Sequence, residues 1–295
     1  MSPSAPAPPQ GSALPAFIAL VASAIAMGIS PVFVRLADVG PYTSAFWRVA
    51  LALPLLFAWA KADRTAAPVR KFQWPVILSG LAFAGDLLFW HLSVVHTSVA
   101  NATFFATTAP VWVAIFGWLL FARKVSAMVL LGLSLCLLGG AALVAQSFAL
   151  DRLRVSGDMF GLCTAVFFGL YFLAVGRARE KVGAAQVTFE LSVVTALVLL
   201  GVALAFEGKF WPATLQGWLA VLGMAFISHA GGQGLLSIAL GRLPAMFASL
   251  VIFLEAIAAA TFGWLILGEA VSLVQAMGGL LILAGIFVAR PRGEP

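Results

Sequence analysis

The chain is a succession of long apolar runs, separated by short segments that hold most of its charged residues, prolines and glycines. Inside the runs, apolar and polar positions do not alternate, whereas an outer-membrane barrel shows alternating segments of about ten residues. Each run approaches the roughly 20 residues that a helix needs to cross a bilayer. We therefore predict ten transmembrane helices, at 14–34, 42–60, 74–95, 98–121, 126–146, 156–176, 186–206, 213–236, 243–267 and 271–289.

A stretch in the first half of the chain recurs in the second. Residues 98–140 align with residues 244–286 without a gap, so that Phe116-Gly117-Trp118-Leu119 falls on Phe262-Gly263-Trp264-Leu265, Gly132 on Gly278, and Gly139 on Gly285. Each half holds five predicted helices. Because five is odd, the second half enters the membrane from the opposite side. The pattern predicts an inverted repeat, the architecture of many secondary transporters.

The fold class that follows is an all-α polytopic membrane protein with ten transmembrane helices in two inverted five-helix repeats. The N-terminal segment is rich in proline and alanine, which predicts disorder. We expect a disordered cytoplasmic tail at 1–13, the first repeat at 14–146, a linker at 147–155, the second repeat at 156–289, and a second cytoplasmic tail at 290–295.

Lipid must cover most of the surface of this protein. Hydrophobic residues make up 62% of the 295 residues, charged residues only 9%, and the mean hydropathy is +1.06. Soluble domains carry about 25% charged residues, so a chain of this composition cannot solvate its own surface. The net charge of +6 does not indicate a nucleic-acid partner, because no basic patch is interleaved with aromatic residues.

Lysine and arginine gather in alternate loops. If the N-terminus is cytoplasmic, the cytoplasmic segments contain Lys61, Arg64, Arg70, Lys71, Arg123, Lys124, Arg177, Arg179, Lys181, Arg242, Arg290 and Arg292. The external loops then contain only Arg35, Arg152, Arg154 and Lys209. By the positive-inside rule, we expect a multi-pass protein of the cell inner membrane with both termini in the cytoplasm.

Four charged residues interrupt the apolar runs: Arg48, Asp86, Glu190 and Glu255. Each costs roughly 2.5–3.5 kcal/mol near the membrane centre, which favours a functional role. Glu255 is a candidate for substrate binding or proton uptake, with a structural ion pair as the alternative. Arg48 is either a structural clamp or the receiver of a substrate carboxylate, since its planar guanidinium suits bidentate binding. For Glu190, the alternative to substrate binding is a structural role near a helix end. Asp86 is expected to pair with a residue of a neighbouring helix.

Two polar stripes are candidate walls of an aqueous cavity. Trp90 adjoins His91 in the third predicted helix, with Asn101 at the start of the fourth. His229 and Gln233 are four residues apart in the eighth, so they share a helix face. Glycines spaced by seven residues in the fifth and tenth helices predict that these two helices pack together, or that they form the seam of a homodimer; a monomer is also plausible.

The sequence lacks the motifs of an enzyme. It has no phosphate-binding loop, no cluster of His and Cys at metal-ligand spacing and no nucleophile elbow. No soluble segment is long enough to house catalysis. We therefore expect no enzymatic activity, no catalytic residue, no cofactor and no metal. Transport that uses a gradient, or that runs down one, is the function class that remains.

Several stretches resemble the drug/metabolite transporter superfamily: Pro41-Tyr42-Thr43-Ser44-Ala45-Phe46-Trp47-Arg48, Thr97-Ser98-Val99-Ala100-Asn101-Ala102, Ala109-Pro110-Val111-Trp112 and Leu267-Gly268-Glu269. The resemblance spans the whole chain and is to the ten-helix EamA-type members, in particular the bacterial aromatic amino-acid exporters of the YddG type. The family often ends its fourth helix with an acidic residue, where this sequence has Arg123-Lys124. The second copy keeps Glu269, for which we expect a structural role at a helix end.

The resemblance implies export of amino acids, aromatic and other apolar ones over a broad range, by alternating access from a central cavity. An amino acid needs a cation for its carboxylate, an acceptor for its ammonium group and an apolar wall for its side chain. The candidate substrate-binding residues are Arg48, Trp90, His91, Asn101, Phe104, Tyr171, Glu190, His229, Gln233 and Glu255. The alternatives are an exporter of hydrophobic cationic drugs or other small metabolites, for which Glu255 alone would suffice, and a structural subunit without a polar cavity.

Overall fold

The computed structural model of the chain describes residues 13–63, 71–144, 152–267 and 272–290. Most of the predicted N-terminal tail, most of the predicted linker at 147–155, the segment 291–295 and Glu269 lie outside the described residues. Within the described parts, every regular element is a helix.

Among the described residues, nine helical segments are long and apolar enough to cross a membrane, and a tenth, α15, is a shorter apolar helix of 17 residues. In chain order the helices are α1 (Ala13–Gly28), α2 (Ser30–Leu36), α3 (Pro41–Ala50), α4 (Leu53–Ala62), α5 (Trp74–His96), α6 (Val99–Thr107), α7 (Ala109–Phe121), α8 (Ala127–Val144), α9 (Arg152–Arg179), α10 (Ala184–Phe206), α11 (Leu215–Gly223), the π-helix η1 (Met224–Gln233), α12 (Gly234–Leu240), α13 (Ala245–Val251), α14 (Leu254–Leu267) and α15 (Leu273–Ala289). The apolar runs therefore predicted the spans to within a few residues.

Several predicted helices are broken in mid-span, which the sequence analysis did not foresee. The breaks separate α1 from α2, α3 from α4, α6 from α7 and α13 from α14. In the first three, a proline stands in the first turn of the second segment: Pro31, Pro54 and Pro110. Proline lacks the N–H that would bond to the preceding turn, and its ring clashes with that turn. The regular pattern of helical hydrogen bonds is therefore interrupted within these spans.

The eighth span contains a π-helix, η1, between α11 and α12. A π-helix places one extra residue in each turn, and such turns are frequent at functional sites. The segment includes Gly231 and Gly232, and an added Cβ at Gly232 would lie 2.6 Å from the Met27 side chain of α1. The glycine therefore allows the close approach of η1 to α1.

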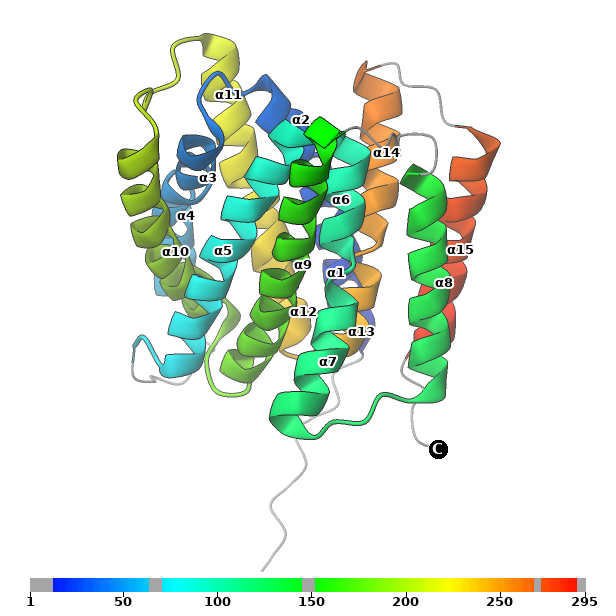
Figure 1. The fold of residues 1–295 in the computed structure, drawn as a ribbon. Coiled ribbons are helices and arrows are strands. Elements are labelled where there is room, and N and C mark those ends of the chain that lie inside the picture. The colour runs from blue at the N-terminus through cyan, green and yellow to red at the C-terminus, as the bar shows by residue number, and fades with distance from the viewer. Residues whose placement is uncertain (1–12, 64–70, 145–151, 268–271, 291–295) are drawn as a thin grey trace, which may run out of the picture.

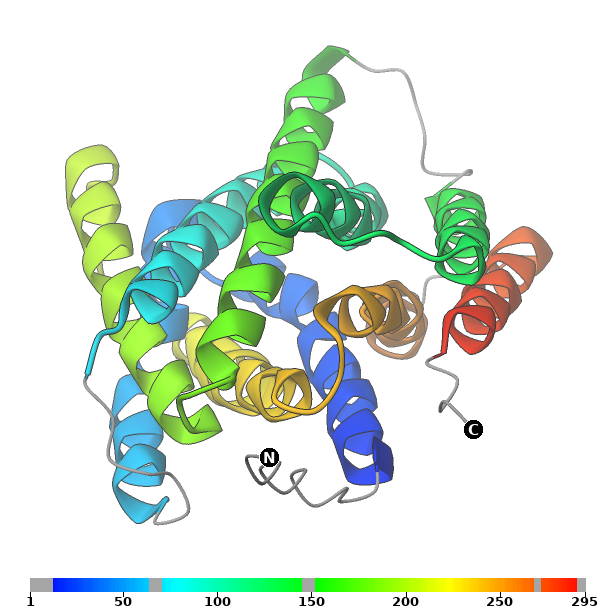
Figure 2. The same ribbon diagram turned by 90° about the horizontal axis from the view of Figure 1, so that it is seen from below.

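Helices α8 and α15 lie side by side at one edge of the bundle (Figures 1 and 2). A Cβ added at Gly132 would be 2.5 Å from the carbonyl oxygen of Gly285, and one added at Gly139 would be 2.5 Å from that of Gly278. Only glycine permits backbones to approach so closely. The predicted packing of the fifth helix on the tenth is present, and both glycine faces are used within one chain rather than in a dimer seam.

The first residues of α1 and the last of α15 lie at the same end of the bundle (Figure 1), which we call the terminal face. The opposite face holds the α2–α3 and α10–α11 loops (Figure 1). Figure 2 views the bundle from the terminal face, with α5, α9 and α13 among the helices that surround its centre. The buried core joins residues from both halves of the chain, including Leu20, Phe83, Phe172 and Phe253.

Candidate functional site

A small cavity lies at the centre of the bundle, where helices of both repeats meet. It is lined by Met27, Arg48, Asp86, Leu87, Trp90, Ala106, Phe168, Gln233 and Glu255, and its volume is about 20 Å³. A space of this size holds about one water molecule. The structure is therefore closed around the site, and a larger solute enters only if the surrounding helices move.

Arg48, Asp86 and Glu255 reach this cavity from different helices. Arg48 stands in the last turn of α3, next to the break before α4, and Asp86 lies within α5. Glu255 lies in the first turn of α14, directly after the break that follows α13. The sequence predicted a single helix at 243–267 and did not indicate this break. The three side chains are 4%, 6% and 8% exposed, so their charges are shielded from bulk solvent.

The charged groups of the cavity are near one another but are not joined in an ion pair. Arg48 donates through Nη1 to the Ser30 hydroxyl at 3.0 Å, and its guanidinium carbon lies 5.4 Å from the centre of the Trp90 ring. Its Nε has no partner. Among the described residues, neither Asp86 nor Glu255 lies within 4.0 Å of Arg48 in an ion pair. A polar solute in this cavity would therefore meet one guanidinium group and two carboxyl groups beside apolar side chains.

A layer of polar side chains supports the cavity from behind. The Tyr171 hydroxyl donates to Gln233 Oε1 at 2.8 Å, which satisfies the polar partner that a buried tyrosine requires. Gln233 Nε2 in turn lies 3.1 Å from the sulfur of Met27. The ring of Phe83 lies between those of Tyr171 and His229, at centroid distances of 4.9 and 5.4 Å. Tyr171 therefore orients Gln233 and does not itself line the cavity.

Both candidate histidines are fully buried beside the cavity and each has one free ring nitrogen. His91 Nδ1 is 2.8 Å from the Ser44 hydroxyl, and its ring meets that of Trp90 edge-on. His229 Nε2 is 2.9 Å from the Ser192 hydroxyl. The second ring nitrogens, His91 Nε2 and His229 Nδ1, have no hydrogen-bond partner in the part of the chain that the structure describes.

Like Tyr171 and the two histidines, three more predicted site residues do not line the cavity. Asn101 lies near the start of α6 and donates to Asp158 Oδ1 at 3.3 Å. Phe104 faces α8, where an added Cβ at Gly140 would lie 2.7 Å from its ring. Glu190 accepts hydrogen bonds from the Phe72 backbone N–H at 2.7 Å and from Gln186 at 2.9 Å. It therefore anchors the segment before α5.

Asp86 and Phe168 belong to the cavity although the sequence analysis did not include them in the site. Asp86 was expected to pair with a neighbouring helix. The charge of Asp86 within an apolar run is the sequence feature that indicates a site residue. Phe168 gave no such signal, because one phenylalanine in an apolar run is indistinguishable from lipid-facing or core residues.

Aromatic side chains close the opposite face of the molecule. Trp47, the neighbour of Arg48, donates through its indole N–H to the Phe210 carbonyl at 2.7 Å. Its ring lies 4.8 Å from that of Trp211 and 5.9 Å from that of Trp218. The same buried cluster includes the cavity residue Trp90. An apolar plug therefore extends from the cavity to the loop between α10 and α11.

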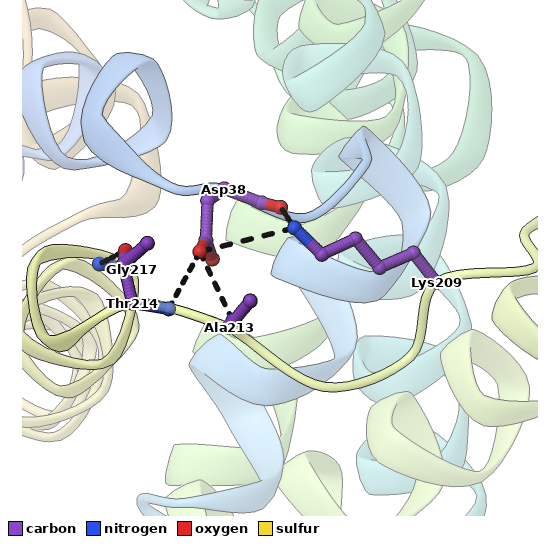
Figure 3. A network of polar contacts seen from close by, with 5 residues as sticks. All are labelled: Asp38, Lys209, Ala213, Thr214 and Gly217. Carbon is purple, nitrogen blue, oxygen red and sulfur yellow. Dashed lines mark hydrogen bonds and ion pairs between the residues drawn. The ribbon is translucent and has the colours of Figure 1, made fainter.

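A polar network joins the two loops of the opposite face (Figure 3). Asp38, between α2 and α3, accepts the backbone N–H groups of Ala213 at 3.0 Å and Thr214 at 2.8 Å, and lies 3.8 Å from the Lys209 ammonium group. Burial alone would raise the pKa of Asp38, but hydrogen bonds from Thr214 and Ala213 and the charge of Lys209 hold this pKa below its ordinary 3.8. The network fixes the first repeat to the second at this face.

A second carboxylate makes a similar connection. Glu207, directly after α10, accepts the backbone N–H groups of Tyr42 at 2.8 Å and Thr43 at 2.9 Å, one on each oxygen. These N–H groups belong to the first turn of α3, whose amide groups have no partner within the helix. A negative charge at a helix N-terminus is stabilising, so Glu207 holds α3 and its Arg48 against the second repeat.

A comparison with protein families identifies the fold. The model of the EamA-like transporter family matches residues 14–145 and again residues 155–290. The chain belongs to the EamA-like transporter family. It is a multi-pass membrane protein with the two-repeat fold of that family, and its curated relatives are named transporters, which points to a protein that is not an enzyme.

Individual relatives are distant but cover most of the chain. An uncharacterized transporter of Archaeoglobus fulgidus is 27% identical over 278 residues, 92% of this chain and 94% of that protein. The pseudopaline exporter CntI of Pseudomonas aeruginosa is 23% identical over 247 residues, 84% of this chain and 83% of that protein. A solved crystal structure superimposes with a TM-score of 0.76 at 21% identity over 94% of this chain and 95% of that one, which supports the fold alone.

Proposed function

We propose that this transporter exports amino acids, aromatic and other apolar ones over a broad range, by alternating access across a bacterial inner membrane. The observation that carries the proposal is the cavity, in which Arg48 stands with Asp86 and Glu255 beside Trp90 and Phe168. A zwitterion with an apolar side chain complements this set. The pseudopaline exporter among the relatives supports outward transport, while the amino-acid substrate rests on the chemistry of the cavity.

In the proposed complex, the substrate carboxylate accepts hydrogen bonds from the Arg48 guanidinium, which presents a fork of N–H donors. Arg48 Nε, which has no partner in the closed cavity, becomes satisfied. The ammonium group donates to Asp86 and Glu255. Trp90 and Phe168 cover the side chain. Such walls discriminate weakly, since one methylene is worth about 1–3 kcal/mol, and a broad substrate range follows.

Binding requires the bundle to open, because the cavity of about 20 Å³ cannot contain an amino acid. The breaks before α4 and α14 adjoin Arg48 and Glu255, so bending at these breaks moves the charged groups with the half-helices that carry them. Opening toward the opposite face has to separate the Trp47 cluster and the Asp38 network. Discontinuous helices at a midplane site are a recurring feature of secondary transporters.

The proposal places the terminal face in the cytoplasm. Described lysine and arginine residues near that face include Lys61, Lys71, Arg123, Lys124, Arg177, Lys181, Arg242 and Arg290. Those near the opposite face are Arg35, Arg152, Arg154 and Lys209. Positively charged loops are retained on the cytoplasmic side during insertion. Export then means uptake of substrate at the terminal face and release at the opposite face.

Flux through purified protein in liposomes tests the substrate class. We expect uptake of radiolabelled phenylalanine, and competition by other apolar amino acids. Arg48→Gln should lower this flux at least about tenfold, because a hydrogen bond to a charged group contributes roughly 1.5–3 kcal/mol. Trp90→Ala should also lower it, whereas the matched control Trp118→Ala should not, because Trp118 is 63% exposed on the surface of α7. Equal flux through all variants would contradict the proposed site.

A second candidate function is export of hydrophobic cations. It is favoured by the presence of two carboxylates and a single guanidinium in the cavity, an excess of negative charge when all three groups are ionised. In that case Arg48→Gln retains transport and Glu255→Gln abolishes it. A liposome assay with a fluorescent lipophilic cation alongside phenylalanine distinguishes the two functions. Transport of the cation alone would replace the amino-acid proposal.

A further inference from the structure

A large groove opens on the outer surface of the bundle, away from the central cavity. Its walls come from α1, from α13 and α14, and from α15, and its volume is about 1010 Å³. Its sides are apolar, with Phe17 and Val21 on α1, Leu254 and Ile257 on α14, and Leu283 on α15 among the lining residues. We call it the α1–α15 groove. Apolar grooves of this size on a membrane protein are covered by something in the bilayer.

The groove extends over one leaflet of the membrane. Along α1 its lining residues run from Leu14 to Ile25, at spacings of three and four that place them on one face of the helix. Eleven steps at 1.5 Å span roughly 16 Å. The hydrocarbon core of a bilayer is about 30 Å thick. The groove therefore extends from the terminal face to about the membrane centre, the depth that an acyl chain of that leaflet occupies.

The mouth of the groove at the terminal face is positively charged. Arg242, in the segment between α12 and α13, and Arg290, directly after α15, both line the groove, and both side chains are exposed. The guanidinium carbon of Arg290 lies 4.1 Å from the centre of the Phe287 ring, which holds the side chain at the edge of the apolar wall. The lining contains no aspartate or glutamate. An anion at the mouth would meet two cations and no opposing charge.

We propose that the α1–α15 groove binds an anionic phospholipid of the leaflet at the terminal face, with its acyl chains along α1 and α14 and its phosphate between Arg242 and Arg290. The apolar walls match the chains, the length matches one leaflet, and the paired arginines match the headgroup. Thr261 is the one uncharged polar side chain of the lining, which contains no carboxylate, so an amino acid would find no negatively charged partner there for its ammonium group.

The position of the groove connects the lipid with the transport site. Leu254 and Ile257 face the groove from the same first turns of α14 that present Glu255 to the central cavity. At Ala258, which also lines the groove, Gly28 of α1 approaches α14 so closely that an added Cβ would lie 2.5 Å from the Ala258 side chain. A lipid between α1 and α15 therefore supports the half-helix that carries Glu255.

Native mass spectrometry of the purified full-length protein tests the site. The probes are phosphatidylglycerol and phosphatidylcholine with identical acyl chains. Wild-type protein should retain phosphatidylglycerol preferentially. The double variant Arg242→Gln/Arg290→Gln should weaken its retention roughly 25-fold, since each cation near an anionic surface contributes about a 5-fold gain in affinity. Leu283→Trp, which fills the groove and leaves both arginines in place, should lose retention as well.

Arg123→Gln is the matched control, because Arg123 also lies exposed near the terminal face over an aromatic ring, Phe121 at 5.4 Å, but outside the groove. It should retain the lipid like the wild type. An equal loss in this control would show attraction to a generally basic face and overturn the proposal. Equal retention of both lipids by the wild type, displacement of the lipid by phenylalanine, or a dimer that the double variant abolishes would overturn it too.

Discussion

Replacing Gly139 by alanine should destabilise the packing of α8 on α15 by an amount that the backbone geometry sets. The added Cβ would lie 2.5 Å from the Gly278 carbonyl oxygen and 2.9 Å from the Ile282 backbone nitrogen. An ordinary contact begins at 3.4 Å, so the helices would have to part by about 0.9 Å, the difference between 3.4 and 2.5 Å. Both atoms are backbone, and no flexible side-chain end can yield. The shift would also loosen the neighbouring Gly132–Gly285 contact.

The expected cost is about 1–3 kcal/mol, the range for an extra carbon forced into a packed interior. Alanine also gains roughly 0.8–1.0 kcal/mol over glycine within a helix, which would mask part of this cost. Gly201→Ala removes that ambiguity. Gly201 lies within α10, and nothing comes within 4 Å of an added Cβ there. Both variants share the gain in helix propensity, so the difference between them isolates the packing term.

The assay is thermal unfolding of both variants and the wild type in the same detergent and at the same scan rate, because membrane proteins often unfold irreversibly. Gly139→Ala should unfold at a lower temperature than Gly201→Ala, by about 2–4 °C per kcal/mol as in domains of somewhat smaller size. Equal midpoints, or a higher midpoint for Gly139→Ala, would refute the conclusion that the glycine contacts set the spacing of α8 and α15.

Two further predictions concern the loops. The lowered pKa of Asp38 means that its carboxylate stabilises the fold above the ordinary value of 3.8, and that this stabilisation is lost as pH falls through the lower folded value. Asp38→Asn should therefore lower the unfolding midpoint at pH 7, and this difference should shrink as the pH falls below 3.8, as thermal scans over this range will show. For orientation, cysteines at Lys181 and Lys209, both exposed, should react with a membrane-impermeant maleimide from opposite sides of the membrane. Labelling from one side would contradict the inverted topology.

The sequence predicted the positions of the spans because lipid imposes a simple requirement on each of them. A span needs about twenty apolar residues whose backbone groups are satisfied internally, and this requirement is met locally. The glycine pairing of the fifth and tenth helices was predictable for a related reason. Gly132, Gly139, Gly278 and Gly285 mark a smooth face on each helix, and the repeat alignment showed that the two faces correspond.

The composition of the central cavity could be predicted only in part, because it depends on where the helices break. Arg48, Trp90, Gln233 and Glu255 line the cavity. Glu190 does not, since its position on α10 directs the carboxylate to the backbone before α5. A helical wheel assumes a regular 3.6-residue turn, and that assumption fails at the α3–α4 and α13–α14 breaks and within η1.

The breaks also show how the two copies of the repeat have diverged. When Phe116 is aligned with Phe262, the break after α13 at 252–253 corresponds to positions 106–107, at the end of α6. Both copies therefore interrupt the same helix at nearly the same place. In this register Glu255 corresponds to Ala109, so only the second copy has a carboxylate beside its break. The backbone geometry has been kept while the charge has not.

This divergence distributes the charged groups over both repeats, and the distribution matters for the proposed transport. Arg48 and Asp86 belong to the first repeat, Gln233 and Glu255 to the second. A ligand shifts a conformational equilibrium only by its differential affinity for the two states. A zwitterion that contacts Arg48 with one end and Glu255 with the other binds most tightly when the two repeats lie at one particular distance from each other. A cation held by Glu255 alone has no such dependence on the separation. Under the proposed function, the solute that spans both repeats is the one that can drive the bundle from one access state to the other.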